Sequence, residues 1–549
     1  MMRLHHPPTP THLHPRSSPC TSRAPDTQLP VHLRAPDMRA SLLFALALCQ
    51  LSAAAAAVQV TIGDVLNDVD REYASWNIDP SCNRGFHHID YSNKNLAAAA
   101  RGLSPSRMRF GGSGADALVY GLSANASECA GIPPAPAPPS PDCVYCTPGC
   151  LNGTHLDGIF SLARQAGADV IFGVSFSIHE ACAAGATYNW SRGTGRQNAQ
   201  NLMDGMKARG IKPFALEAGN EINNNNVEGA PCQFTPEMQA GFMSDLASMA
   251  AATLPGTLLV GPDTGGGAPL AWLEALLPML PSHLLRAVTH HVYNGVDRRT
   301  WNSSKQLDNS AAEIAWYSNV TASLAPGVAV WAGENGPTGG GNDGTCGADS
   351  VCGNYASSLW YADDMATRAR AGFASYQRQT LFGGAYGLTN SASGTMALAT
   401  GEPLTLRPDY WQSFLWKRTL GQAILNASSS DASVRAYAFA GAPPSPWAAT
   451  ECRATSLLLL NLGATAADVA LPPAPGGSAW AAWTLAPGSD GPFGLTATLN
   501  TVPLPTVVDL NGGGDAPFLQ SITVAPMAGT VAGGVTLQPQ STTFLCYRD

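Results

Sequence analysis

Two glutamates stand at the ends of apolar segments that have the composition of buried strands. Glu221 follows a Gly-Asn pair in LEAGNEINN (216–224), and Glu334 ends GVAVWAGE (327–334). Two carboxylates that face each other suit the hydrolysis of a glycosidic bond, because a protonated one gives its proton to the leaving oxygen while the other attacks the anomeric carbon or activates water. A single glutamate at a strand end serves equally well as a helix cap or an ion-pair partner. The pair is therefore more informative than either member.

Short apolar runs that alternate with helical stretches predict the elements that position these glutamates. From residue 58 to 420 this alternation favours a (β/α)8 TIM barrel as the catalytic domain. Residues 235–254 and 356–373 are expected to be helices between strands. Because a barrel builds its site at the carboxyl ends of its strands, and the glutamates are about three strand–helix units apart, we expect them to face each other across the mouth. The runs expected to be buried parallel strands include DVIFGVSF (169–176), KPFALEAGNE (212–221), GTLLVGPD (256–263), RAVTHHVY (286–293) and GVAVWAGE (327–334).

The remainder of the chain, residues 421–549, has the pattern of a β-sandwich domain. Its short β-type segments are separated by Gly/Pro turns and include SVRAYAFAG, SLLLLNLG, ADVALP, AWAAWTL and TTFLCY. The first strand of the 58–420 region is assigned either to the barrel or to this β-domain. The expected fold class is therefore α/β, a TIM barrel with a C-terminal β-sandwich.

Residues 1–57 have the pattern of a leader. An apolar stretch from Leu42 to Leu51 follows Met38, and small residues suited to signal-peptide cleavage occupy 53–57. We favour a cleaved secretory signal that begins at Met38, because the strongly apolar part is short; a retained membrane anchor is the alternative. The protein is thus expected to be secreted to the cell exterior or cell wall, or else to associate with a membrane or enter a vacuole.

The cysteines that follow the leader fit an exported protein. There are eleven of them, an odd number, so at least one is expected to be free or paired between chains. Cys143, Cys146 and Cys150 have a spacing that zinc sites use, but no matching His/Cys pair follows, so we favour disulfides. Glycosylation sequons, which fit exported surface loops, start at Asn125, Asn152, Asn189, Asn302, Asn319 and Asn426.

The charge of the chain excludes one class of partner. Charged residues make up only 13% of the sequence, and the formal net charge is -9. Because there is no basic stripe to follow a phosphate backbone, nucleic acid is not an expected partner. The segment HEACA (179–183) lacks the second histidine of a zinc protease, and no G-x-S-x-G elbow occurs. No metal or organic cofactor is expected.

Seven segments occur in the order in which a known family carries them. From about residue 60 to the C-terminus the chain resembles the heparanase-type endo-β-glucuronidases of glycoside hydrolase family 79. It is most similar to the plant heparanase-like branch, through THHVYN and RQTLFGGAYGL. The segments are RMRFGGSGADALVY, VIFGVSF, ALEAGNEINN, VTHHVYNG, VWAGENGPTGGG, YQRQTLFGGAYGLTN and PDYWQSFLWKRTLG.

The resemblance implies a role for each glutamate. Glu221 matches the general acid/base after the fourth barrel strand, and Glu334 matches the nucleophile after the seventh. A retaining mechanism with a covalent glycosyl-enzyme intermediate follows from that assignment. In such enzymes the two carboxyl groups lie about 5 to 5.5 Å apart.

Neighbouring positions match residues that bind the sugar in the family. Asn220 matches the asparagine that binds the 2-hydroxyl, a hydrogen bond that strengthens at the transition state. Tyr293 falls near the sixth-strand tyrosine that positions the nucleophile. His290 and His291 either support the barrel mouth or contact the sugar.

Two further sets concern the recognition of the glucuronide. Gly339 and Gly340 belong to the Gly run after the nucleophile, whose backbone N–H groups are expected to bind the sugar carboxylate, and Tyr386 matches a tyrosine that contacts it. The family's sugar-binding aspartate near the first strand is replaced by Asn77, with Asp79 two residues on. Either Asn77 substitutes as a neutral hydrogen-bonding group or Asp79 serves.

The acidic, lysine-poor composition bears on the substrate. A densely sulfated glycan would find few cationic partners, so we expect glucuronic-acid-containing glycans of cell-wall or proteoglycan type rather than heparan sulfate. One alternative is another retaining barrel glycosidase, such as a β-glucosidase or β-xylosidase. A second is an inactive carbohydrate-binding relative, against which the presence of both glutamates argues.

Overall fold

The structure is a computed structural model. It describes residues 57–80, 86–123, 127–132, 149–177, 190, 194–225, 234–266, 269–338, 351–394, 397–473, 477–511 and 516–548. In these ranges no helix has the length and apolarity needed to span a bilayer. Some of the predicted features lie outside the described residues, namely the leader up to residue 56, Cys143, Cys146, Gly339, Gly340, Asn125 and Asn189.

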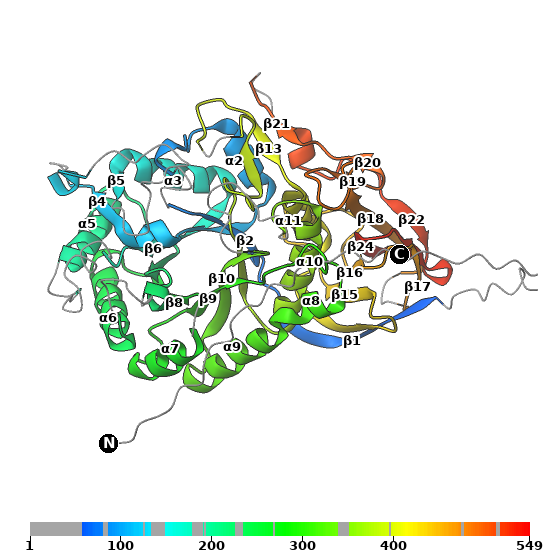
Figure 1. Cartoon of the computed structure of the whole chain (residues 1–549), viewed down its shortest axis with the longest axis horizontal. Coiled ribbons are helices and arrows are strands. Elements are labelled where there is room, and N and C mark those ends of the chain that lie inside the picture. The colour runs from blue at the N-terminus through cyan, green and yellow to red at the C-terminus, as the bar shows by residue number, and fades with distance from the viewer. Residues whose placement is uncertain are drawn as a thin grey trace, which may run out of the picture. The chain divides into compact units, whose positions relative to one another are not determined.

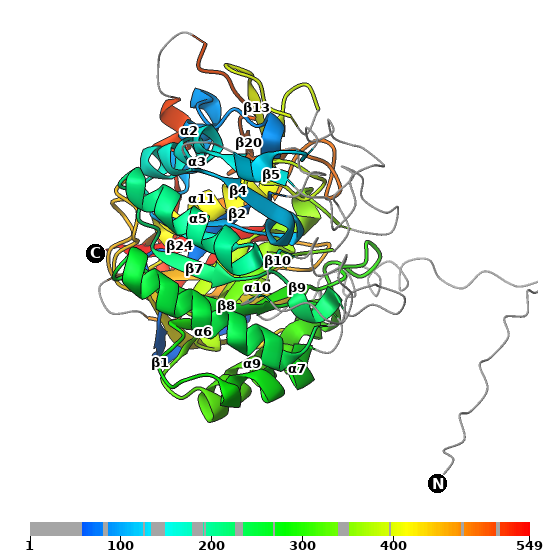
Figure 2. The same ribbon diagram turned by 90° about the vertical axis from the view of Figure 1, so that its left-hand side faces the viewer.

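Eight parallel strands close into a barrel, as predicted (Figures 1 and 2). The five apolar runs named above are the third to the seventh of these strands, so the TIM-barrel prediction is confirmed. The barrel strands in chain order are β2 (Ala74–Ile78), β3 (Ser106–Phe110), β6 (Ala168–Val174), β7 (Ala215–Ala218), β8 (Leu258–Thr264), β9 (Ala287–Tyr293), β10 (Ala329–Gly336) and β11 (Ser375–Arg378).

The amino-terminal part of the barrel interior is packed with apolar side chains. One residue from each of five consecutive strands contributes to this cluster, which makes the barrel a solid core rather than a pore. The polar side chains of the site stand further along the same strands, toward their carboxyl ends. The five residues are Ile171, Ala215, Val260, Ala287 and Trp331.

Helices cover the outside of the barrel (Figure 2). The helices expected at 235–254 and 356–373 are confirmed as α6 (Pro236–Thr253) and α10 (Tyr355–Arg370). The others are α2 (Lys94–Gly102), α3 (Gly153–Ala166), α5 (Thr194–Ala208), α7 (Pro269–Leu276), α8 (Ser304–Leu307), α9 (Ala311–Leu324) and α11 (Pro408–Thr419).

The start of α6 shows why the sequence begins a helix there. The Thr235 side chain accepts a hydrogen bond from the backbone N–H of Met238, and Pro236 occupies the first turn. A hydroxyl cap satisfies one of the four unpaired N–H groups, and proline is tolerated where its missing N–H is not needed. The side chain of Asn354 caps α10 in the same way.

The C-terminal region forms the predicted β-sandwich. The five segments predicted there correspond to β15 (Val434–Ala440), β16 (Thr455–Asn461), β17 (Ala467–Ala470), β18 (Ala479–Pro487) and β24 (Ser541–Arg548). The strand β1 (Val58–Asp68) pairs antiparallel with β14 (Ala423–Ser429), so it belongs to this sheet and not to the barrel. The described chain thus starts in the β-domain, builds the barrel and returns.

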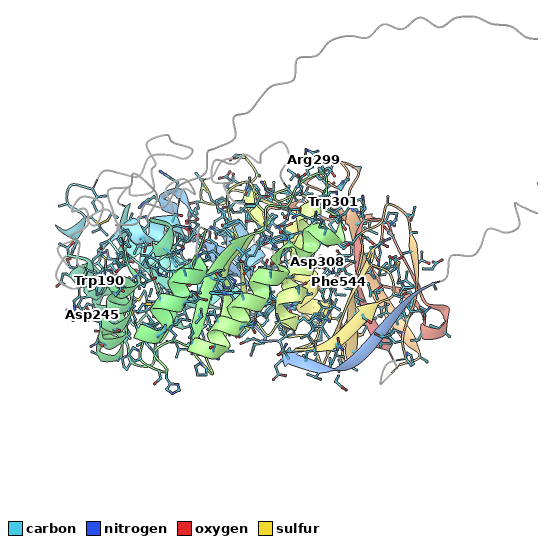
Figure 3. The ribbon with its side chains drawn as sticks, turned by 60° about the horizontal axis from the view of Figure 1, so that its bottom comes forward. Trp190, Asp245, Arg299, Trp301, Asp308 and Phe544 are labelled. Atoms are coloured by element: carbon cyan, nitrogen blue, oxygen red, sulfur yellow. A yellow bond between two sulfur atoms is a disulfide. The ribbon has the colours of Figure 1, made fainter. Side chains whose placement is uncertain are left out.

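Helices α10 and α11 lie between the barrel and the sheet (Figure 1). The Tyr437 hydroxyl donates to an oxygen of Asp363 at 2.6 Å, which ties β15 to α10. A second link joins Arg435 of β15 to Asp308, labelled in Figure 3, at 2.8 Å. The first contact is buried and helps to hold the two layers in one arrangement, whereas the second is exposed and contributes less.

Described cysteines form disulfides, including Cys150, for which the sequence allowed either zinc binding or a disulfide. Cys129 pairs with Cys150, and Cys452 pairs with Cys546. Cys352 is disulfide-bonded as well. Since the Cys150 sulfur is used in a disulfide, it is not a zinc ligand, and the preference for disulfides is confirmed for these positions.

Candidate active site

Polar side chains from six barrel strands converge at the carboxyl-terminal end of the barrel. Each stands at the end of its strand or directly after it, which is where a TIM barrel builds its site. The residues are Asp79 after β2, Arg109 on β3, Asn220 and Glu221 after β7, Asp263 on β8, His291 and Tyr293 on β9, and Glu334 on β10.

The two glutamates approach the same ring nitrogen of one imidazole. Nδ1 of His291 lies 2.7 Å from Oε1 of Glu221 and 3.8 Å from Oε2 of Glu334. One carboxylate oxygen from each glutamate and a ring nitrogen of His291 lie within 4.8 Å of one another. The closure of the barrel therefore brings together residues from its fourth, sixth and seventh strands.

The same three side chains could hold a metal ion, and they are the one such group in the described ranges. Their surroundings already carry positive charge, because Arg109 donates to Glu334 at 2.9 Å. The charges of Asp263 and Glu334 raise the pKa of His291 well above its ordinary value, against burial, which lowers it. Arg109 and His291 thus place positive charge beside these carboxylates, at the position that a metal ion would otherwise serve.

Both carboxylate oxygens of Glu334 accept hydrogen bonds. Oε2 accepts from Nη1 of Arg109 at 2.9 Å, and Oε1 accepts from the hydroxyl of Tyr293 at 2.5 Å. Burial raises the pKa of Glu334, and the nearby charge of Glu221 acts in the same direction, whereas His291 and Arg109 lower it. The position of this carboxylate is fixed before any substrate binds.

Glu221 is bound to different partners. Its Oε1 faces His291, and its Oε2 accepts from the side-chain amide of Asn224 at 3.0 Å. Burial raises the pKa of Glu221, but the hydrogen bond and charge of His291 outweigh it, so the pKa is lowered. Both directions, the lowered pKa of Glu221 and the raised pKa of His291, favour a proton on the imidazole over one on the carboxylate.

Arg109 is the centre of a fully buried network. Its Nε donates to Glu217 at 2.5 Å, and Nη2 donates both to Asn220 at 2.9 Å and to Asp263. Burial raises the pKa of Glu217 to about 8, while Arg109 and His291 help to lower that of Asp263 to about 2. Asp263 is thus an anion that pairs with both Arg109 and the far ring nitrogen of His291, at 2.6 Å.

The backbone around Glu221 is unusual. Gly219 has φ of 79° and Glu221 has φ of 48°, in the left-handed region that non-glycine residues seldom adopt. The N–H of Glu221 donates to the carbonyl oxygen of Asp263 at 2.9 Å. The N–H of Asn220 donates to the carboxylate of Asp116 at 2.9 Å. Neighbouring strands and loops therefore impose the shape of this turn.

The structure places Asn77 and Asp79 at different depths. The Asn77 side chain is fully buried, and its amide donates to Gln379 at 3.0 Å and to the carbonyl of Gly333 at 3.3 Å. Asp79 accepts from the same Gln379 at 2.7 Å, and its charge reaches Glu334. Because the two residues point the same way from the strand, Asn77 lies one layer deeper and Asp79 lies at the mouth.

Tyr386 lies beside Tyr293, the tyrosine that is hydrogen-bonded to Glu334. Its ring centroid is 5.9 Å from that of Tyr293, and it is buried in a small cluster with Cys352 and Ala385. The structure therefore groups Tyr386 with Tyr293 and Glu334. The other two residues expected at the sugar carboxylate, Gly339 and Gly340, lie outside the described residues.

His290 and His291 point to opposite sides of the barrel wall. His290 stacks on Tyr317 with ring centroids 3.6 Å apart and lies 3.0 Å from Glu313 of α9. It therefore supports the wall from outside, whereas His291 faces the site. The sequence left both roles open for both residues; the pleat of β9 decides only which of the two side chains faces the site.

Sequence reasoning missed Arg109, Glu217 and Asp263. A signal existed, because a charged residue inside an apolar strand of a barrel is rare unless it is paired in the interior. RMRF places Arg109 in such a strand, and GTLLVGPD ends in Asp263. What the sequence did not show is which strand each of them faces.

The buried pair of Asp263 and His291 predicts a pH dependence of stability. The folded pKa of His291 is raised above its unfolded value, so its contribution to the free energy of unfolding is fully present below about pH 6.5 and is lost as the pH rises through the folded pKa. The melting temperature of wild type should exceed that of His291→Gln by an amount that shrinks as the pH rises. Thermal unfolding from pH 5.5 to 9.5 measures this.

The matched control is His283→Gln, at an exposed histidine outside the site. Its difference from wild type should stay small and nearly constant over the same range. A wild-type advantage over His291→Gln that grows with pH would contradict a protonated His291.

The fold and the convergence of these carboxylates at its mouth define a barrel glycoside hydrolase. A sequence model described as "Glycosyl hydrolase family 79, N-terminal domain" matches residues 67–366. The chain belongs to glycosyl hydrolase family 79.

Named relatives agree with this family. The chain is 24% identical over 396 residues to Heparanase-like protein 3 of Arabidopsis thaliana. This match covers 70% of this chain and 67% of the relative. It is 25% identical over 397 residues to Heparanase of Mus musculus, and this match covers 66% of this chain and 69% of the relative. It is 23% identical over 376 residues to Baicalin-beta-D-glucuronidase of Scutellaria baicalensis, and this match covers 62% of this chain and 64% of the relative. It spans 60% to 67% of the length of three Arabidopsis heparanase-like proteins.

Solved structures share the fold. One is a 4-O-alpha-L-rhamnosyl-beta-D-glucuronidase from Fusarium oxysporum 12S, with TM-score 0.59 and 14% identity, covering 89% of this chain and 100% of that one. Another is an alpha-L-arabinofuranosidase from Thermotoga maritima, with TM-score 0.60 and 12% identity. This match covers 89% of this chain and 99% of the arabinofuranosidase. At such identities the likeness concerns the fold alone.

Proposed function

We propose that this protein is a retaining β-glucuronidase that hydrolyses glucuronic-acid-containing glycans through Glu221 and Glu334. The observation that carries the proposal is the short distance between the two carboxylates, with one oxygen of each inside a group of atoms that lie within 4.8 Å of one another. Retaining glycosidases hold the two groups about 5 to 5.5 Å apart, whereas inverting ones leave about 6.5 to 9.5 Å for a water molecule. The short separation supports attack by a carboxylate.

In the first step an oxygen of Glu334 attacks the anomeric carbon and forms an ester. The bond from that carbon to the aglycone oxygen breaks, and this oxygen takes a proton from Glu221. In the second step Glu221, now a carboxylate, takes a proton from water while the water oxygen attacks the anomeric carbon. The ester breaks, and both side chains return to their first state.

The proton for the first step is stored on the pair of Glu221 and His291. Since Nδ1 of His291 lies 2.7 Å from Glu221, the proton can move to the carboxylate along an existing hydrogen bond. The neutral imidazole then keeps its other N–H against Asp263, which fixes its tautomer. Tyr293 and Arg109 orient Glu334 for attack.

Recognition of the glucuronide is assigned to the other strand ends. We assign Asn220, whose amide oxygen is fixed by Arg109, to the 2-hydroxyl and Asp79 to the glycone hydroxyls. Tyr386 and the N–H groups of Gly339 and Gly340 are assigned to the sugar carboxylate. The name of one similar protein, Baicalin-beta-D-glucuronidase, supports this glycone.

A panel of nitrophenyl glycosides tests the proposal. The purified protein should hydrolyse the β-glucuronide at least about tenfold more efficiently than the β-glucoside or β-xyloside, since a site built for a carboxylate leaves polar groups unpaired with a neutral sugar. Proton NMR of the first product should show the β anomer. The α anomer would establish inversion, and turnover of only the glucoside or xyloside would assign a different glycone.

No turnover of any glycoside would overturn the proposed activity. Binding of glucuronide oligosaccharides by such an inert protein, measured calorimetrically, would then indicate a carbohydrate-binding relative. Secretion is part of the proposal, and the disulfides Cys129–Cys150 and Cys452–Cys546 support folding in an oxidising compartment.

A further inference from the structure

Asp116 lies outside the set of residues assigned to the reaction or the sugar. It belongs to the turn Ser113–Ala117 that follows β3, and its side chain has no exposed surface. Oδ2 accepts the backbone N–H of Asn220 at 2.9 Å, and Oδ1 accepts that of Phe176 at 3.2 Å. One carboxylate thus links the loops after the second, third and fourth barrel strands.

The turn that Asp116 holds carries the acid/base candidate. Glu221 has a left-handed backbone, which is unfavourable for a residue with a side chain and persists only where the surroundings impose it. Two consecutive N–H groups are held from opposite neighbours: that of Asn220 by Asp116, and that of Glu221 by the carbonyl of Asp263. If either acceptor is lost, the turn can relax and move the Glu221 carboxylate.

Asp116 is itself held in place. Its backbone carbonyl accepts from the hydroxyl of Ser175 at 2.9 Å, and the same hydroxyl accepts the N–H of Ser177 at 3.0 Å. Two N–H donors arrive at its carboxylate from different loops, so two acceptor oxygens are needed there. Asparagine has the same size but only one oxygen, and its NH2 group would face one of the donors.

We propose that Asp116 is a positioning residue that sets the location of the Glu221 carboxylate relative to the leaving oxygen, without contacting the substrate. The inference rests on the proposed function. It differs from a general structural role in one respect: its loss should impair proton donation and leave the attack by Glu334 intact. Displacement by about 1 Å can cost on the order of 10²-fold in rate.

The test compares aryl β-glucuronides whose leaving groups differ in basicity. A dinitrophenolate leaves without a proton, whereas an unsubstituted phenolate needs one, and kcat/KM reports the first step alone. For Asp116→Asn we expect kcat/KM to fall about 10²-fold with phenyl β-glucuronide and by less than about threefold with the dinitrophenyl compound.

The matched control is Asp363→Asn, at a buried aspartate bound to Tyr437 between α10 and β15. Any loss there should be equal across leaving groups. An equal loss across leaving groups for Asp116→Asn, or no loss, would overturn the proposal.

Ser175→Ala decides the question if Asp116→Asn does not fold. It removes the hydrogen bond to the Asp116 carbonyl and the one that the hydroxyl accepts from the N–H of Ser177, and it leaves the Asp116 carboxylate in place. It should give a smaller loss, again confined to the basic leaving groups; a uniform loss would overturn the proposal. The glycosides that wild type cleaves distinguish a failure of the proposed function from a failure of the proposal for Asp116. If it cleaves glucosides instead, the proposed glycone fails and the same series is measured on that sugar. If it cleaves no glycoside, both proposals fail.

Discussion

Glu334→Gln is expected to lower kcat on every aryl β-glucuronide by on the order of 10⁵-fold, whatever the leaving group. The amide cannot form the ester, and the bonds from Arg109 and Tyr293 that orient the carboxylate would hold a poor nucleophile in its place. Glu221→Gln should instead lower kcat/KM strongly with phenyl β-glucuronide and only slightly with the dinitrophenyl compound. Steady-state kinetics on purified variants measures both.

Azide distinguishes the two roles by stereochemistry. In Glu221→Ala it should restore turnover of the activated substrate and give the β-glucuronyl azide, because it attacks the glycosyl-enzyme. In Glu334→Ala it should attack the substrate directly and give the α-azide. Glu274→Gln, at an exposed glutamate on α7, should behave as wild type. Exchange of the two azide anomers would reverse the assignment of acid/base and nucleophile.

Arg109→Met is expected to lower the free energy of unfolding at pH 7 by about 3–5 kcal/mol. The substitution leaves the buried carboxylates of Asp263 and Glu334 without their shared guanidinium. In wild type the pKa of Asp263 is lowered to about 2, so its stabilising contribution is present above about pH 4 and is lost as the pH falls through 2. Without Arg109 that pKa rises.

The difference between wild type and Arg109→Met should therefore be largest above pH 4 and shrink as the pH falls. Urea unfolding at several pH values measures it. Arg286→Met, at an exposed arginine, should change stability by less than about 0.5 kcal/mol. A loss below about 1 kcal/mol for Arg109→Met at pH 7 would show that the network does not depend on this charge.

The sequence by itself determined the elements and the two glutamates. Local period and composition are read from neighbouring residues, so five of the eight barrel strands, β6 to β10, and the helices α6 and α10 were predicted within a few positions. Glu221 and Glu334 were found because each ends an apolar run. The sandwich followed from short β-type segments and their turns.

Only the tertiary structure decided which side chains meet. Arg109, Asp263 and His291 stand on strands far apart in the chain, and closure of the barrel is what makes them neighbours. The pleat decided that His290 faces the helices and His291 the site, and that Asn77 lies a layer below Asp79. Such contacts depend on strand register and side-chain direction across the whole barrel, which no local stretch of sequence encodes.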